Sequence, residues 1–77
     1  MVIKILGGGC KNCQILHQNT LEALKELDIQ AEVIKVQEMK DIMAYGVMKT
    51  PALVVDEDIK VMGRVPKVKE IVKVLGE

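Results

Sequence analysis

The most constraining feature of this sequence is a pair of cysteines, Cys10 and Cys13, that follows three glycines and has no third cysteine to join. A disulfide between them would close a loop too short to contribute much stability through chain entropy. Secreted mini-proteins instead spread several cysteines to link distant segments. The fold must therefore be stabilised by aliphatic side chains, and we expect the Cys10–Cys13 pair to have a chemical rather than a structural role.

The composition predicts one small globular domain over residues 1–77. Hydrophobic residues make up 49% of the chain and charged residues 29%, which is typical of a folded protein and not of a disordered tail. There is no Phe or Trp and one Tyr, so Ile, Leu and Val are expected to form the core, with the five Met as gap-fillers.

Charge and hydropathy exclude several function classes. Lys and Arg number 11, as do Asp and Glu, and the resulting zero net charge removes the electrostatic argument for nucleic acid or an anionic membrane. No apolar run approaches the ~18 residues of a membrane span. The apolar start contains Lys4 and stops at glycines, unlike a signal peptide. We expect the protein to be cytoplasmic and to be a monomer.

Hydrophobic periodicity predicts the elements of the first half. Val2–Leu6 is typical of a short strand, and a helix is expected from Cys10 to Leu27. Ala31–Val36 is expected to be a second strand, whose charged residues indicate an edge position. One stripe of the helix should be apolar and buried: Cys13, Leu16, Thr20, Leu24 and Leu27.

The second half predicts a short helix, a hairpin and a last helix. Glu38–Tyr45 is expected to be helical and to end at Gly46. Ala52–Val55 is expected to be a buried strand that turns through acidic residues into Ile59–Met62. In the last helix, Pro66 suits the first helical position.

The resulting βαβαββα order predicts an α/β fold with one four-stranded mixed sheet and helices on both faces. A right-handed crossover makes the first two strands parallel. The final hairpin then adds two antiparallel strands, and the last helix should cover the sheet beside the first.

The spacing of Cys10 and Cys13 suits thiol–disulfide exchange. That reaction needs an exposed thiolate to attack and a second thiol close enough to resolve the mixed disulfide. At the mouth of a helix, free N–H groups and the dipole favour the thiolate of Cys10. Cys13 lies one turn further, in the apolar stripe. We therefore assign Cys10 as the nucleophile and Cys13 as the resolving thiol.

A different class of function uses the same two thiolates. Cys10 and Cys13 could be half of a soft-metal site, as in a metal-binding module or metallochaperone. Structural zinc usually takes four ligands, and His17 is the one nearby residue that could join the pair. Covalent haem attachment would require His directly after Cys13, where Gln14 stands.

Together these features resemble a minimal thioredoxin fold, similar to the small redox-active disulfide proteins and glutaredoxin-like thioredoxins. The resemblance rests on the element order, on Cys-x-x-Cys at the first strand–helix junction, and on Thr50-Pro51 before a buried strand, with Gly63 after the last strand. It implies a cis Pro51 facing the cysteines and a Thr50 backbone that binds extended substrate peptides.

The resemblance also implies an enzyme, a protein-disulfide oxidoreductase. Its only redox group would be the disulfide Cys10–Cys13, without a further cofactor or metal. Its partners would be protein disulfides and a reductant, either a thioredoxin-reductase-like protein or a small thiol. Thioredoxins carry an aromatic before the first cysteine and Gly-Pro inside the motif, whereas this chain has Gly9 and Lys11-Asn12. We therefore predict slow recycling by a standard thioredoxin reductase.

Three other residues allow two interpretations each. Lys4 could lower the pKa of a cysteine or simply extend to solvent from the end of the sheet. His17 could accept the proton of Cys13 or be a structural histidine. Met48 is expected either to line a groove beside Pro51 or to fill core volume.

Overall fold

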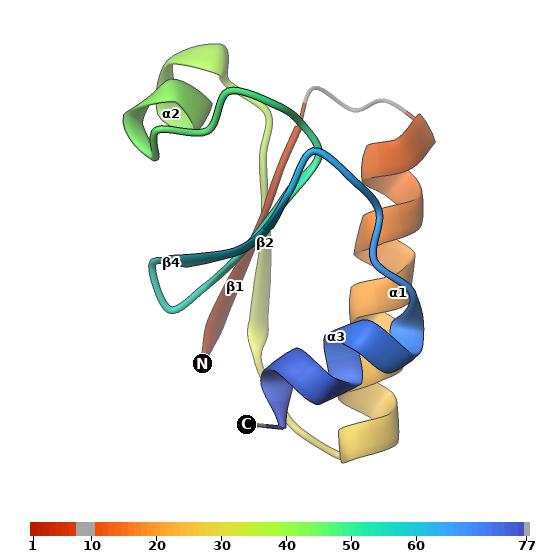
Figure 1. The fold of residues 1–77 in the computed structure, drawn as a ribbon. Helices are drawn as coiled ribbons and strands as arrows, with labels where there is room; N and C mark the ends of the chain where they lie inside the picture. Colours follow the sequence, from red (N-terminus) through yellow and green to blue (C-terminus); the bar gives the residue numbers. More distant parts are fainter. Residues whose placement is uncertain (8–10, 77) are drawn as a thin grey trace.

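The computed structural model describes residues 1–7 and 11–76, so Cys10 lies outside the described residues. The elements follow the predicted βαβαββα order (Figure 1). Their bounds are β1 Val2–Leu6, α1 Lys11–Leu27, β2 Glu32–Val36, α2 Met39–Ala44, β3 Ala52–Val55, β4 Asp58–Met62 and α3 Val68–Leu75. Within the described residues, no helix is both long and apolar enough to cross a membrane.

The strands form one mixed sheet in the order β2-β1-β3-β4, which confirms the predicted fold class. β1 pairs with β2 in parallel and with β3 antiparallel, and β3 pairs antiparallel with β4. β2 is therefore an edge strand, as its charged residues indicated. The β3–β4 hairpin turns at Asp56 and Glu57, whose φ values of 49° and 71° are those of a type I′ turn.

Helices cover both faces of the sheet (Figure 1). α1 and α3 pack together on one face, and α2 lies on the other. Successive strand residues point to opposite faces, so the sheet builds two cores. The larger core contains Ile3, Ile5, Leu16, Ala23, Leu24, Leu53, Val55, Val61, Ile71 and Leu75. The smaller core, under α2, contains Leu6, Ile42, Val47, Ala52 and Val54.

The predicted stripe of α1 faces the larger core. Cys13, Leu16, Thr20 and Leu24 are buried, and Leu27 is half-buried. The Thr20 hydroxyl donates a 2.8 Å hydrogen bond to the Leu16 carbonyl, so it is satisfied within the helix. The stripe therefore fixes which way the first turn of α1 faces and places Cys13 against the sheet.

The expectation that methionines fill the core is wrong. All five Met side chains are exposed, from 45% for Met1 to 90% for Met48. Both cores lie against strands, where branched aliphatic residues supply the volume. The methionines instead occupy outward positions: α2 buries only Ile42, which leaves Met39 and Met43 in solvent. The core-filling alternative for Met48 is thereby excluded.

The start of the last helix also differs from the expectation. α3 begins at Val68 with Lys67 as its N-cap, so Pro66 is not the first helical residue. Pro66 is buried, and its carbonyl accepts a 3.1 Å hydrogen bond from the Asn19 side chain of α1. The Pro66 carbonyl therefore has its hydrogen-bond partner on α1 rather than within α3. At the end of α2, by contrast, Gly46 has the expected positive φ, 77°.

Candidate active site

Cys13 lies in the first turn of α1, 6% exposed, and contacts the glycine that ends β1. A Cβ atom on Gly7 would lie 2.2 Å from Cys13 Sγ and 3.2 Å from Cys13 Cβ. Real atoms do not approach this closely, so Gly7 is required for the thiol to occupy its place. The sequence alone did not predict this contact; the one signal for it is a glycine placed between a strand and a helix.

The Thr50–Pro51 segment meets the same glycine. A Cβ atom on Gly7 would lie 4.0 Å from Pro51 Cα, so Gly7 has Cys13 and Pro51 as neighbours. The Thr50–Pro51 peptide bond is cis, the isomer that the sequence resemblance implied. Pro51 is buried and Thr50 is exposed. The fold thus brings together two segments that lie far apart in the sequence.

A hydrogen bond from the end of β4 holds the main chain at Pro51. The Pro51 carbonyl accepts a 2.9 Å hydrogen bond from the Gly63 N–H, which follows β4. Gly63 has a φ of 79°, and a Cβ there would lie 3.1 Å from Lys49 Cβ. Among the described residues, Thr50 makes no backbone–backbone hydrogen bond. Its main-chain groups are therefore placed where an extended peptide could reach them.

A pocket of about 150 Å³ opens beside Cys13, between α1 and the ends of β1 and β2. Strand register explains which residues reach it. Ile5 of β1 pairs with Lys35 of β2, and paired residues project to the same face. Gly7 and Gln37 follow directly after the ends of β1 and β2, two residues beyond Ile5 and Lys35. Six described residues line the pocket: Ile5, Gly7, Cys13, Gln14, Lys35 and Gln37.

His17 lies one helical turn after Cys13 and is partly buried. Burial lowers the pKa of its imidazole below the ordinary value of 6.5, and the nearby Lys35 ammonium lowers it further. His17 is therefore uncharged at neutral pH. Its role as acceptor of the Cys13 proton stays a prediction.

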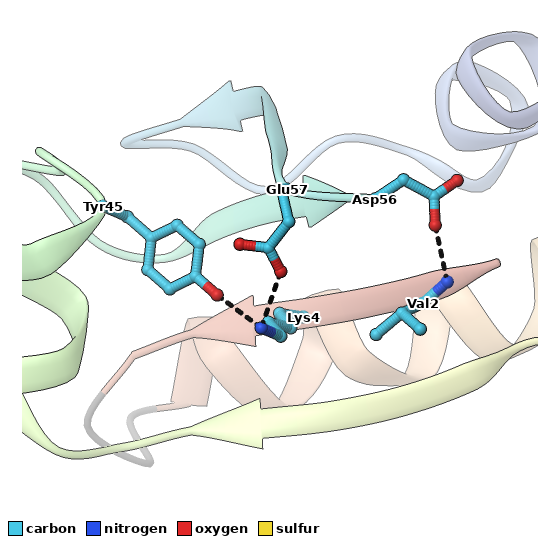
Figure 2. Close-up of polar contacts among 5 residues, drawn as sticks. All are labelled: Val2, Lys4, Tyr45, Asp56 and Glu57. Carbon is cyan, nitrogen blue, oxygen red and sulfur yellow. Dashed lines mark hydrogen bonds and ion pairs between the residues drawn. The ribbon is translucent and has the colours of Figure 1, made fainter.

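Lys4 does not face Cys13. Its side chain lies on the α2 face of the sheet, where its ammonium donates a 2.8 Å hydrogen bond to Glu57 and a 2.5 Å hydrogen bond to the Tyr45 hydroxyl (Figure 2). The pKa of Lys4 is raised, chiefly by the Glu57 bond and then by the Tyr45 bond. The hypothesis that Lys4 activates a cysteine is therefore wrong for Cys13, which lies across the sheet. Sequence reasoning missed both partners.

The Lys4–Glu57 ion pair predicts a pH-dependent contribution to stability. Its hydrogen bond to Lys4 lowers the pKa of Glu57 from its ordinary 4.5. A lowered pKa means that the stabilisation is present above the unfolded pKa and is lost as the pH falls through the folded one. We expect Glu57→Gln to lower the free energy of unfolding at pH 7, by an amount that disappears in acid. Urea unfolding from pH 7 to pH 3 measures this.

The matched control for this test is Asp58→Asn, which removes a neighbouring carboxylate without a described ion pair. It should show a much smaller difference between neutral and acid pH. A Glu57→Gln effect that stays constant across the range would contradict the ion-pair explanation.

No group of three or more His, Cys, Asp or Glu that could hold a metal ion occurs among residues 1–7 and 11–76.

Comparison with known proteins identifies the family to which this arrangement belongs. A family model described as a thioredoxin domain matches residues 1–76. The chain belongs to the thioredoxin family. It is 49% identical over 76 residues to a protein named thioredoxin from Methanothermobacter thermautotrophicus, with 99% of each chain covered. It is 39% identical over 71 residues to a thioredoxin from Methanocaldococcus jannaschii, covering 92% of this chain and 81% of that one.

Membership of the thioredoxin family makes this chain, in general terms, a thiol–disulfide oxidoreductase, and it does not favour the metal-binding alternative. The family also agrees with the geometry of the described residues. Cys13 lies where the first strand gives way to the first helix, and Pro51 lies close by. This end of the sheet is therefore the candidate active site.

Proposed function

We propose that the chain is a protein-disulfide oxidoreductase in which Cys10 attacks a partner disulfide and Cys13 resolves the mixed disulfide. The observation that carries the proposal is the position of Cys13, buried against Gly7 and close to Pro51 at one end of the sheet. A thiol at 6% exposure is poorly placed to meet a bulky protein disulfide. It is better suited to attack a sulfur bonded to Cys10, three residues earlier in the chain.

The exchange proceeds in two steps that conserve electrons. The Cys10 thiolate attacks one sulfur of the partner disulfide, and the other partner sulfur leaves as a thiolate. The Cys13 thiol then loses its proton and attacks the Cys10 sulfur, which releases the second partner thiol and forms the Cys10–Cys13 disulfide. The partner disulfide is thereby reduced to two thiols while the protein dithiol is oxidised.

The Thr50–Pro51 segment is proposed to bind the partner as an added strand. Thr50 is exposed and makes no backbone–backbone hydrogen bond to the described residues. Main-chain hydrogen bonds to an extended peptide do not depend on the partner's side chains, so many sequences could be accepted. Met48, 90% exposed just before this segment, offers an apolar surface to the same partner.

The reductant that resets the disulfide is proposed to be a thioredoxin-reductase-like protein or a small thiol. Thioredoxins generally act on protein disulfides and are reduced by such a reductase. We further propose that the protein is a monomer in the cytoplasm, because a reducing compartment keeps a dithiol available for exchange.

We expect this protein to reduce a generic protein disulfide when dithiothreitol is the electron donor, but to be recycled slowly by a standard thioredoxin reductase. The reason is that Gly9 and Lys11-Asn12 replace the aromatic and Gly-Pro of thioredoxins, which such a reductase would contact. Substrate reduction with dithiothreitol, compared with NADPH consumption through the reductase, separates the two steps. Fast turnover with the reductase would show that these residues do not control recognition.

The metal-binding alternative is tested on the same sample. For an oxidoreductase, mass spectrometry should show a gain of two hydrogens on reduction, and metal analysis should find no stoichiometric ion. Failure to reduce any disulfide with dithiothreitol, together with a bound metal that blocks alkylation of both thiols, would replace the proposed function with metal binding.

A further inference from the structure

The zero net charge of the chain conceals a separation of charge along the sheet. α1 begins at the candidate active site and ends far from it, whereas β2 begins at the far end and β3 ends there (Figure 1). Residues at the ends of these elements therefore decide which charges lie at which end of the molecule. The far end carries a group of carboxylates: Glu26, Asp28, Glu32, Asp56, Glu57 and Asp58.

Positive charges predominate at the active-site end. Lys11 is the first residue of α1, Lys35 is the last residue but one of β2, and Lys49 directly precedes the Thr50–Pro51 segment. The start of α2, on the other face of the sheet, carries both signs: Glu38, Lys40 and Asp41. A partner that approaches the described part of the active site therefore meets more cations than carboxylates.

Lys49 is the cation that contacts place beside the proposed peptide-binding segment. A Cβ atom on Gly63 would lie 3.1 Å from Lys49 Cβ, 3.8 Å from its Cγ and 3.3 Å from its Cδ, so the lysine stem runs across this glycine. The Gly63 N–H in turn donates a 2.9 Å hydrogen bond to the Pro51 carbonyl. The stem of Lys49 is therefore packed on the residue that holds Pro51, and its ammonium, two bonds beyond Cδ, lies close to that segment.

The positive charge of Lys49 is not neutralised by a described carboxylate. Arg64 follows Gly63 directly, but its guanidinium forms an ion pair with Glu70. The other ion pair within residues 1–7 and 11–76 is Lys4–Glu57. Neither pair includes Lys49, which is exposed. A carboxylate on a bound partner therefore finds an available cation next to Thr50.

We infer that the protein prefers partner disulfides flanked by acidic residues, and that Lys49 determines this preference. The inference rests on the proposed function, because it requires that the partner binds along the Thr50–Pro51 segment. Opposed residues of neighbouring strands have their Cβ atoms about 4.5–5.5 Å apart, so a carboxylate beside the partner's cysteine reaches the Lys49 ammonium. This ion pair strengthens binding and takes no part in the covalent steps.

The separation of charge adds an effect on the encounter. Complementary charges raise the association rate of two molecules, and this steering falls with ionic strength. An acidic partner is attracted by the active-site end and repelled by the carboxylates at the far end, so it arrives with the productive orientation. The preference is therefore expected in kcat/KM, which includes the encounter, and much less in kcat.

The test uses three disulfide-linked peptides that are identical except for the residues flanking the cysteine, which are Glu, Gln or Lys. Dithiothreitol is the donor, and kcat/KM for each peptide is divided by its rate with dithiothreitol alone, which corrects for intrinsic reactivity. We expect the corrected value to be highest for the Glu peptide and lowest for the Lys peptide. Lys49→Gln should lower the ratio between these two about twofold to fivefold, the effect of one cross-strand ion pair. Added salt should lower the ratio in the wild type.

Further substitutions separate the charge of Lys49 from its shape. Lys49→Arg keeps the charge and should keep the order of the three peptides, whereas Lys49→Glu should lower the ratio further than Lys49→Gln does. Lys25→Gln is the matched control, because it removes an exposed lysine in the last turn of α1, at the far end of the molecule. It should leave the ratio unchanged. A preference that survives both Lys49→Gln and Lys49→Glu, or that depends on Lys11 instead, would overturn the assignment to Lys49.

The uncharged Gln peptide separates failure of this inference from failure of the proposed function. If the wild-type protein does not accelerate the reduction of this peptide by dithiothreitol, the proposed function fails, and the inference fails with it. If all three peptides are reduced at the same corrected rate, the oxidoreductase function stands and the acidic preference is wrong.

Discussion

Cys13→Ser is expected to trap a mixed disulfide between Cys10 and a partner protein, whereas Cys10→Ser should trap little. In the first variant the attacking thiol remains and the resolving thiol is missing, so the intermediate accumulates toward one partner per protein. In the second, the remaining thiol is 6% exposed and contacts Gly7, so a bulky disulfide cannot reach it. Non-reducing electrophoresis with a disulfide-containing substrate protein measures both.

Alkylation tests the reactivity of Cys10 without a partner protein. Iodoacetamide should modify Cys10 at a lower pH than a free thiol, whose pKa is about 8.5, because a helix N-terminus favours the thiolate. The double variant, without either thiol, is the control for non-covalent association. Equal trapping through both cysteines would show that burial of Cys13 does not decide which sulfur attacks.

Gly7→Ala is expected to destabilise the protein and to impair resolution by Cys13. The added methyl group would lie 2.2 Å from Cys13 Sγ, so the thiol or the backbone must move. Overpacking of this kind costs about 1–3 kcal/mol. A displacement of about 1 Å at a reacting atom can lower a rate by up to about 100-fold. Urea unfolding and single-turnover reduction of a protein disulfide measure the two effects.

A double-mutant cycle isolates the contact with the sulfur. In a Cys13→Ala background the Sγ atom is absent, and the closest remaining approach of the added methyl group is 3.2 Å, to the Cβ of residue 13. Gly7→Ala should therefore lower the free energy of unfolding less in that background than in the wild type. An equal loss in both backgrounds would assign the effect to backbone conformation rather than to the thiol.

The short strand β1 contributes side chains to both faces of the sheet. In β1, alternate residues point in opposite directions, so Ile5 lies on the side of Cys13 and Lys4 on the side of Tyr45 and Glu57 (Figure 2). The Lys4 ammonium thus connects β1 with the β3–β4 turn through Glu57, and with the end of α2 through Tyr45.

The sequence by itself determined the features that depend on local pattern. Helical periodicity assigned the buried stripe of α1, and with it the inward direction of Cys13. The short aliphatic runs and the turn residues between them predicted the order of elements, the parallel β1–β2 pair and the edge position of β2. These predictions succeeded because spacing along one chain segment decides which face of a helix or strand is apolar.

Only the tertiary structure decided which distant residues meet. The register that places Lys35 beside Ile5, the contact between Gly7 and Cys13, and the pairing of Lys4 with Glu57 join segments whose relative position no local pattern records. The exposure of the methionines has the same origin. Whether an apolar side chain is buried depends on the volume left between packed layers, and here branched residues on the strands already fill that volume.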